Sequence, residues 1–267
     1  MRISYASNRK KDREWTTELC EEYIFKLQDL HQRGFLDSPE QVWNLHETAF
    51  CTTELFDRVV AERGAKQIFS QFNGNEKECV TILPCGNAAG VQLKLLALYA
   101  GKVHLLSRLD DTENLCYHAV NSSGYMDQLH FANYLKEEVF PAMTAMKVCD
   151  ALLVRLKLEK RIPSLHQLFH LFQNVIFVDG HFSHISNILL IRFCKDFEKE
   201  SGKEVAIFCL PSGQTNHLQP FDVSVFGGVK KKWRAYLRDG HFTGAMVCQG
   251  FPLVNKLKPE KLIFSKL

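Results

Sequence analysis

The residues best suited to chemistry stand where an apolar run of the sequence ends. Residues 175–178 are uninterruptedly apolar, as in a strand buried on both faces, and Asp179 follows them directly. Gly180 then breaks the strand, and residues 185–193 carry apolar side chains at helical spacing. Open α/β sheets place ligands at the carboxyl ends of such strands. Asp179 could therefore coordinate a metal ion, act as a base or cap the following helix.

A second acid occupies a comparable place in the chain. Asp222 stands 43 residues after Asp179, at the start of a helix predicted over residues 223–238. Parallel strands joined by a helix would bring the two carboxylates together, and close carboxylates repel unless they share a proton or a cation. Mg²⁺ favours oxygen ligands of this kind, although Asp222 could equally cap its helix.

The apolar patterns predict the elements that would position these acids. Helices are expected over residues 16–32, 128–139, 185–193 and 223–238, and strands over residues 41–50, 80–85, 93–99, 175–178 and 204–210. Residues 86–90 have turn chemistry and predict a hairpin. Pro141 should stop the helix that Asp127 caps, and residues 101–123 form a loop or a weak strand. The order favours an α/β fold with a mixed sheet.

The composition narrows the class of protein. Hydrophobic residues make up 46% of the 267 residues and charged residues 24%, which is typical of a globular protein of one large or two small domains. No apolar run reaches the roughly 18 residues of a membrane span, and the N-terminus lacks the apolar segment of a signal peptide. The nine cysteines are scattered and never form Cys-x-x-Cys, which favours a reduced intracellular compartment.

Five ordered segments resemble motifs of the DDE superfamily transposases, in the pogo/Tigger and Jerky-like branch. The segments are 44–50 (NLHETAF), 80–90 (VTILPCGNAAG), 123–127 (SGYMD), 179–184 (DGHFSH) and 210–226 (LPSGQTNHLQPFDVSVF). The resemblance implies an RNase H-like mixed sheet flanked by helices. It also implies nicking or strand transfer of DNA by two Mg²⁺ (or Mn²⁺) ions held on three acids. Asp179 matches the second acid and Asp222 the third.

The resemblance also predicts how the chain is divided into domains and which partners it has. Residues 1–40 are expected to form a helical lead-in and residues 41–240 a DDE endonuclease-like domain, and residues 241–267 are a tail without a predicted place. DNA is the implied partner and the nucleus the implied location. The family's helix-turn-helix region and its C-terminal segment have no counterpart in this sequence, so we expect a catalytic core that is a fragment or a domesticated remnant. The oligomeric state is left open.

The first acid of the family's three falls at position 46, where this sequence has His46. Imidazole is neutral and is a poorer Mg²⁺ ligand than carboxylate. Losing one charge about 4 Å from the ion, at an effective dielectric constant of about 20, costs about 4 kcal/mol. That is roughly a thousandfold in metal affinity. Glu47 is expected to point to the opposite face of the strand. We therefore expect endonuclease activity to be lost or much reduced.

Two further groups have an ordinary and a functional interpretation. His181 and His184 could bind zinc, but local hydrogen bonding is the commoner role of histidines so placed. Lys230, Lys231, Lys232 and Arg234 follow Asp222 on the predicted helix, where they form either a solvated face or contacts to DNA phosphates.

Three functions remain in consideration. The first is a transposase-derived domain that binds nucleic acid with little or no catalysis. The second is an active DDE nuclease that tolerates His46, which could also join Asp179 and Asp222 in a Mn²⁺ or Zn²⁺ site. The third is a protein-interaction domain that retains only the fold.

Overall fold

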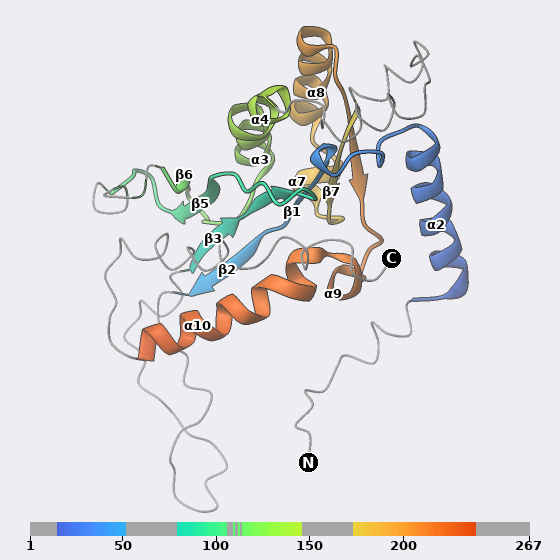
Figure 1. Ribbon diagram of the computed structural model, residues 1–267. Coiled ribbons are helices and arrows are strands. Elements are labelled where there is room, and N and C mark those ends of the chain that lie inside the picture. Colours follow the sequence, from blue (N-terminus) through green and yellow to red (C-terminus); the bar gives the residue numbers. More distant parts are fainter. Residues whose placement is uncertain are drawn as a thin grey trace, which may run out of the picture.

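The computed structural model describes residues 15–51, 79–105, 109, 112, 114–145 and 173–238 (Figure 1). The predicted tail, residues 241–267, lies outside these ranges, so the predicted domain boundaries stay predictions. Among the described helices, none combines the length and the apolar character that crossing a membrane requires.

The described strands form two mixed sheets. The first has the order β4 (Cys85–Asn87), β1 (Val42–Leu45), β7 (Gln173–Val178) and β8 (Glu204–Cys209). The second has the order β2 (Thr48–Cys51), β3 (Cys79–Leu83), β5 (Leu95–Ala100) and β6 (Cys116–Asn121). The β1–β7, β7–β8 and β5–β6 pairs are parallel, and the other pairs are antiparallel. The predicted α/β class with a mixed sheet is confirmed, and so is the hairpin of β3 and β5.

Two chain segments run from one sheet into the other. β1 ends at Leu45 and β2 begins at Thr48, so His46 and Glu47 lie between them. On the neighbouring segment, β3 and β4 are separated by Pro84, which has no N–H to donate to a ladder. The single strand predicted over residues 41–50 is therefore divided in two, at the position of the first expected acid.

Helices cover both faces of the first sheet. On one face, Leu30 of α2 (Thr17–Gln32) packs with Val175 of β7. On the other face, Ile176 packs with Phe131 of α3 (Gln128–Tyr134) and Leu190 of α8 (Ile188–Ser201). Figure 1 shows α2 on one side of β7 and β1, with α3, α4 (Phe140–Ala145) and α8 on the other. Because successive side chains of β7 face opposite layers, its residues 175–178 are all apolar.

One long helix lies against the second sheet. A π-helical turn, η4 (Phe221–Val225), continues into α10 (Phe226–Arg238). Phe226 and Val229 pack with Phe50 of β2 and Val80 of β3. The short helix α9 (Thr215–Leu218) precedes this turn. Asp222 therefore lies inside the first helical turn, and the alternative that it caps the helix is wrong.

Three predicted elements need correction. The helix capped by Asp127 passes through Pro141, which directly follows a π-helical turn (η3, Leu135–Val139) and lies in α4, so the helical run is continuous from residue 128 to residue 145. The helix predicted over residues 185–193 is two helices, α7 (Phe182–Ile185) and α8, separated by Ser186 and Asn187. β6 pairs with β5 over six residues, so the uncertain segment before residue 123 does contain a strand.

Candidate metal centre

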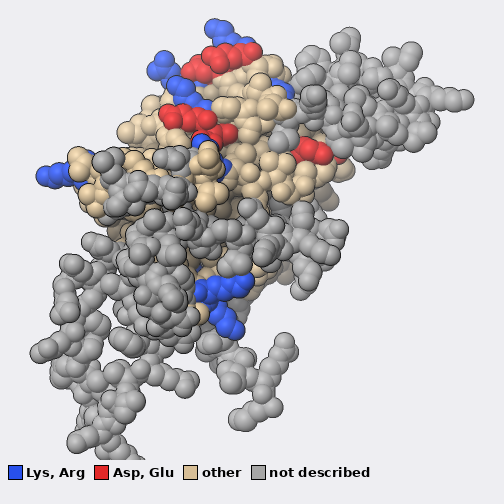
Figure 2. All heavy atoms as spheres, turned by 60° about the vertical axis from the view of Figure 1, so that its left-hand side comes forward, with Lys and Arg blue, Asp and Glu red and all other residues tan. Residues whose placement is uncertain are grey.

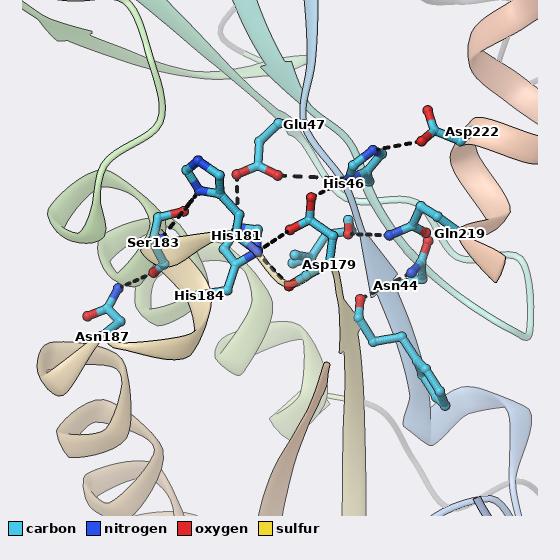
Figure 3. Close-up of polar contacts among 12 residues, drawn as sticks. Asn44, His46, Glu47, Asp179, His181, Ser183, His184, Asn187, Gln219 and Asp222 are labelled. Atoms are coloured by element: carbon cyan, nitrogen blue, oxygen red, sulfur yellow. Dashed lines mark hydrogen bonds and ion pairs between the residues drawn. The ribbon is translucent and has the colours of Figure 1, made fainter. Parts of the chain in front are cut away.

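The parallel pairing of β1 and β7 brings His46 and Asp179 together. The register pairs Asn44 with Phe177, and Asn44 Nδ2 donates a hydrogen bond to the Phe177 carbonyl at 3.1 Å. Two residues further along each strand, His46 Nδ1 lies 3.6 Å from Asp179 Oδ2 (Figure 3). The expected place of Asp179, at the carboxyl end of a buried parallel strand, is the place that the structure gives it.

Asp222 reaches the same position from a different element. Its Oδ2 lies 3.1 Å from His46 Nε2. The segment that carries it is tied to β1 by the buried Gln219, whose Nε2 donates to the Leu45 carbonyl at 3.3 Å. The structure thus brings all three sequence-predicted residues together, with the His46 ring between the two acids.

Glu47 also belongs to this cluster, and the expectation that it points away is wrong. Its Oε2 lies 4.0 Å from His46 Nδ1, on the same side as Asp179. The alternation of a continuous strand does not apply here, because β1 ends before His46 and β2 begins after Glu47. The sequence contains a sign of this break. In a continuous half-buried strand polar and apolar residues alternate, whereas His46 and Glu47 are two adjacent polar residues.

His184 holds the two carboxylates in place. Its Nδ1 lies 2.7 Å from Asp179 Oδ1 and its Nε2 lies 2.8 Å from Glu47 Oε1, and its side chain is fully buried. Burial disfavours the charged ring, but the hydrogen bonds and charges of the two acids outweigh it and raise the pKa of His184 to about 9. At neutral pH it is therefore an imidazolium bridging two carboxylates.

The carboxyl group of Asp179 stays ionised in this setting. Its burial favours the neutral acid, yet the hydrogen bond and charge of His184, the N–H of His181 at 3.1 Å and the nearby His46 together lower its pKa. Asp179 does not cap α7, because the N-cap residue of that helix is His181. Asp179 only accepts a hydrogen bond from the His181 N–H.

His181 makes the local contacts that its place in the motif favours. Its Nδ1 lies 2.7 Å from Ser183 Oγ. Glu47, His181 and His184 are near enough for a shared ion. However, both ring nitrogens of His184 already contact carboxylates, so this group offers a metal fewer free donor atoms than the group around His46.

The four basic residues predicted to contact nucleic acid lie on α10. Lys231, Lys232 and Arg234 are exposed, whereas Lys230 is half-buried with its Nζ 5.9 Å from the centre of the Phe226 ring. Phe226 in turn stacks on His46, at 5.7 Å between ring centres. Figure 2 shows a group of Lys and Arg side chains at the level of α10, apart from the mixed charges at the top of the molecule.

Comparison with known families places the chain. The model of the family described as DDE superfamily endonuclease matches residues 77–245, and the chain belongs to this family. Asp179 and Asp222 lie within the matched segment, whereas His46 and Glu47 precede it. The predicted membership is confirmed at the level of the family, and so are the mixed α/β sheets flanked by helices. The pogo/Tigger and Jerky-like branch stays a prediction.

Among solved structures, the chain is similar to those of the Mos1 transposase. A pre-cleavage Mos1 transpososome has a TM-score of 0.42 at 10% identity, and the match covers 98% of this chain and 63% of that one. The Mos1 strand transfer complex has a TM-score of 0.40 at 12% identity, covering 98% and 62%. The Mos1 mariner paired end complex with Mn has a TM-score of 0.42 at 11% identity, covering 97% and 62%. The chain thus spans less than two thirds of these chains, and no curated protein matches its sequence.

Proposed function

We propose that this chain is a transposase-derived DDE domain that binds DNA and whose Mg²⁺-dependent cleavage is lost or much reduced. The observation that carries the proposal is the place of His46. It stands where the family resemblance requires the first acid, it is only 9% exposed, and its ring lies between Asp179 and Asp222.

The residues present do not fit a centre of two Mg²⁺ ions on three acids. Mg²⁺ demands near-octahedral oxygen coordination, and two ions need carboxylates to offset their charge. His46 supplies a neutral ring nitrogen in place of a charged oxygen, at an expected loss of about 4 kcal/mol in ion binding. Glu47 adds a carboxylate beside Asp179, but the positive ring of His184 contacts both and offsets one of their two charges, so the charge of a three-acid centre is not restored.

The cleavage part of the proposal is tested by nicking of supercoiled plasmid DNA in Mg²⁺ and in Mn²⁺. The native protein is compared with His46→Asp and with His46→Asp/Asp179→Asn. We expect nicking from His46→Asp alone, because that change restores the first of the three acids. Nicking by the native protein in Mg²⁺ would show instead that the nuclease tolerates His46. If none of the three proteins nicks the plasmid, the loss of cleavage has causes in addition to His46.

DNA binding is supported by the basic face of α10, which continues the segment that carries Asp222. Three exposed cations, Lys231, Lys232 and Arg234, follow each other within one turn and a half of helix. Cations so placed neutralise phosphates, and the affinity then falls with salt concentration by a slope of about 0.9 per phosphate on double-stranded DNA.

A matched pair of triple variants tests this binding. Lys231→Ala/Lys232→Ala/Arg234→Ala removes two lysines and an arginine from α10. Arg192→Ala/Lys195→Ala/Lys199→Ala removes the same set of exposed cations from α8. Binding is measured over a salt series in EDTA. We expect the α10 variant to lose affinity and to show a shallower salt slope, while the α8 variant keeps both. If the two variants lose the same DNA affinity, the effect comes from the net charge of the protein and not from the position of the cations on α10.

The alternative that the domain retains only the fold and contacts proteins makes the opposite prediction for the same titration. It expects no salt-dependent DNA affinity in the native protein. The nuclear location depends on the DNA proposal and stays a prediction.

A further inference from the structure

We propose that His46, Glu47 and Asp179 form a binding site for one divalent transition-metal ion, with Mn²⁺ as the ion to test. The site overlaps that of the proposed function and rests on the assignment of this cluster as a metal centre. It requires neither DNA nor cleavage. It also differs from the three-acid arrangement, because Glu47 is a ligand and Asp222 is not.

The geometry of the donor atoms carries the proposal. His46 Nδ1 lies 3.6 Å from Asp179 Oδ2 and 4.0 Å from Glu47 Oε2, and one ligand atom from each residue falls within 4.8 Å of the others. Adjacent ligand atoms about 2.1 Å from an octahedrally coordinated ion such as Mn²⁺ lie about 3.0 Å apart. Side-chain movements of about 1 Å or less would therefore place all three around a single ion.

The ring nitrogen at the centre of the site is unused. His46 is 9% exposed, and its Nδ1 is a buried polar atom without a hydrogen-bond partner. Most buried polar atoms in proteins have such a partner. The other nitrogen, Nε2, faces Asp222 at 3.1 Å, and that contact orients the ring so that Nδ1 points at Asp179 and Glu47 (Figure 3).

A second layer of contacts orients both carboxylates. His184 contacts Oδ1 of Asp179 and Oε1 of Glu47, which leaves Oδ2 and Oε2 on the side of His46. Such outer contacts orient the ligands of protein metal sites. The buried Asn187 holds the end of α7, with Nδ2 2.9 Å from the Ser183 carbonyl, so the element that carries His184 is itself fixed.

The donor set selects the kind of ion. One imidazole nitrogen with two carboxylates resembles the mixed nitrogen and oxygen sites of first-row transition metals, whereas Mg²⁺ prefers oxygen alone. Mn²⁺ accepts both donors and binds thiolates poorly, so the cysteines of the chain compete less for it than for Zn²⁺.

The test is Mn²⁺ binding to the DNA-free protein. Affinity is measured from the electron paramagnetic resonance signal of free Mn²⁺, and the ligand nitrogen is detected by pulsed hyperfine spectroscopy of the bound ion. We expect one ion per chain, a nitrogen coupling, and little displacement by excess Mg²⁺. In His46→Asp the coupling should disappear and Mg²⁺ should compete better.

Single substitutions separate the proposed ligands from their neighbours. His46→Ala, Glu47→Gln and Asp179→Asn should each cost more than the roughly tenfold to hundredfold loss that follows removal of an outer-layer contact. Asp222→Asn and His181→Ala should bind Mn²⁺ with the nitrogen coupling intact. Circular dichroism and urea unfolding without metal show which variants are folded. In folded variants the nitrogen coupling decides whether His46 is a ligand, and the Mn²⁺ affinity decides for Glu47 and Asp179.

Three results would overturn the proposal. The first is absence of a tight Mn²⁺ site in the native protein. The second is a bound ion without nitrogen coupling. The third is loss of binding in Asp222→Asn or His181→Ala but not in Glu47→Gln, since that would assign the ion to the three-acid arrangement or to the neighbouring histidines. DNA binding is measured in EDTA and Mn²⁺ binding is measured without DNA. A negative result in either assay therefore does not affect the interpretation of the other.

Discussion

The buried His184 forms an ion pair with the half-buried Asp179 at the end of β7, with 2.7 Å between Nδ1 and Oδ1. The two residues are only five positions apart in the sequence, so the turn between β7 and α7 is sufficient to bring their side chains together. The same ring contacts Glu47, so one side chain joins the two carboxylates of the candidate metal centre.

This ion pair predicts a loss of stability in mild alkali. The pKa of His184 is raised from 6.5 to about 9, so the folded protein binds an extra proton between these values. The stabilisation is complete below pH 6.5 and is lost as the pH rises through about 9. Its size is on the order of 3 kcal/mol. The free energy of unfolding in urea, measured without metal from pH 6 to pH 10, should fall accordingly.

His184→Gln is the control for this pH dependence. The variant should be less stable at pH 6, and its stability should change less between pH 6.5 and pH 9 than that of the native protein. On the acid side the sign reverses, because the lowered pKa of Asp179 gives stability that is lost only as the pH falls below 3.8. Parallel curves for the two proteins above pH 6.5 would contradict the assignment.

Asn187 should be among the most sensitive polar residues of the described chain. It is fully buried, its Oδ1 accepts from the Leu190 N–H at 3.0 Å, and its Nδ2 donates to the Gln128 and Ser183 carbonyls at 2.7 and 2.9 Å. Asn187→Ala removes a helix cap and both hydrogen bonds that Nδ2 donates, one of them to the buried Ser183 carbonyl. We expect a loss of about 2–4 kcal/mol in the free energy of unfolding.

Two comparison variants separate the contribution of the helix cap to this loss of stability from that of the donated hydrogen bonds. Thr16→Ala removes the exposed cap of α2, where Thr16 Oγ1 accepts from the Leu19 N–H at 3.3 Å, and should cost only about 1 kcal/mol. Asn187→Ser keeps a cap acceptor without a charge but removes both donated bonds, so it should fall between Asn187→Ala and the native protein. If Asn187→Ala costs no more than Thr16→Ala, the buried bonds contribute nothing.

The 123–127 motif has a structural role that a pair of glycine substitutions can test. Gly124 has φ +71°, and a Cβ there would meet Ala100 backbone and side-chain atoms at 3.0 Å. Gly202, the C-cap of α8, has nearly the same φ, +70°, with nothing within 4 Å. Gly202→Ala should cost about 1–2 kcal/mol from the left-handed backbone alone.

Gly124→Ala carries the same backbone cost and adds the overlap with Ala100, for a further 1–3 kcal/mol or so. It also disturbs the carbonyl that accepts from Thr81 Oγ1 at 2.6 Å. Urea unfolding of the two variants under identical conditions measures the difference. Equal losses would mean that the segment moves away from β5 without cost.

The sequence could predict what local pattern and motif determine. The buried strand ending at Asp179, the hairpin and the α/β order follow from residue types that repeat at the period of their element, and the structure confirms them. Asp222 could be assigned to the same site as Asp179 because motif and topology agreed, although in the structure the His46 ring lies between the two acids. These predictions depend on contacts between residues near in sequence, or on the parallel pairing that an intervening helix requires.

The sequence could not predict features decided by packing between distant segments. The break at His46 and Glu47 arises where one chain segment passes from a sheet with β7 to a sheet with β3, and this places both side chains on one side. The contact of His184 with Glu47 joins residues 137 positions apart. The helix that passes through Pro141 contains a π turn, whose extra residue no apolar period reveals.

Cys51 and Cys79 should form a disulfide under oxidation. They are directly paired across the antiparallel strands β2 and β3, with 2.8 Å between the sulfur atoms. A disulfide needs about 2.0 Å, so a small side-chain movement suffices. Burial, the hydrogen bond to Cys51 and its charge raise the pKa of Cys79 to about 11. Because the thiolate is the reacting form, oxidation by diamide should be slow at pH 7 and faster at pH 9.

Mass spectrometry of peptides from the alkylated, non-reduced protein identifies the bond by the loss of two hydrogens, which the diamide takes up. The closed loop spans 28 positions, and loop-closure entropy predicts about 3–4 kcal/mol of added stability. Cys51→Ser is the control, since it should remove both the cross-link and the stabilisation and leave other cysteines to react separately. Bonding of Cys79 to another cysteine in the native protein would contradict the pairing, because only Cys51 faces it across the described ladder.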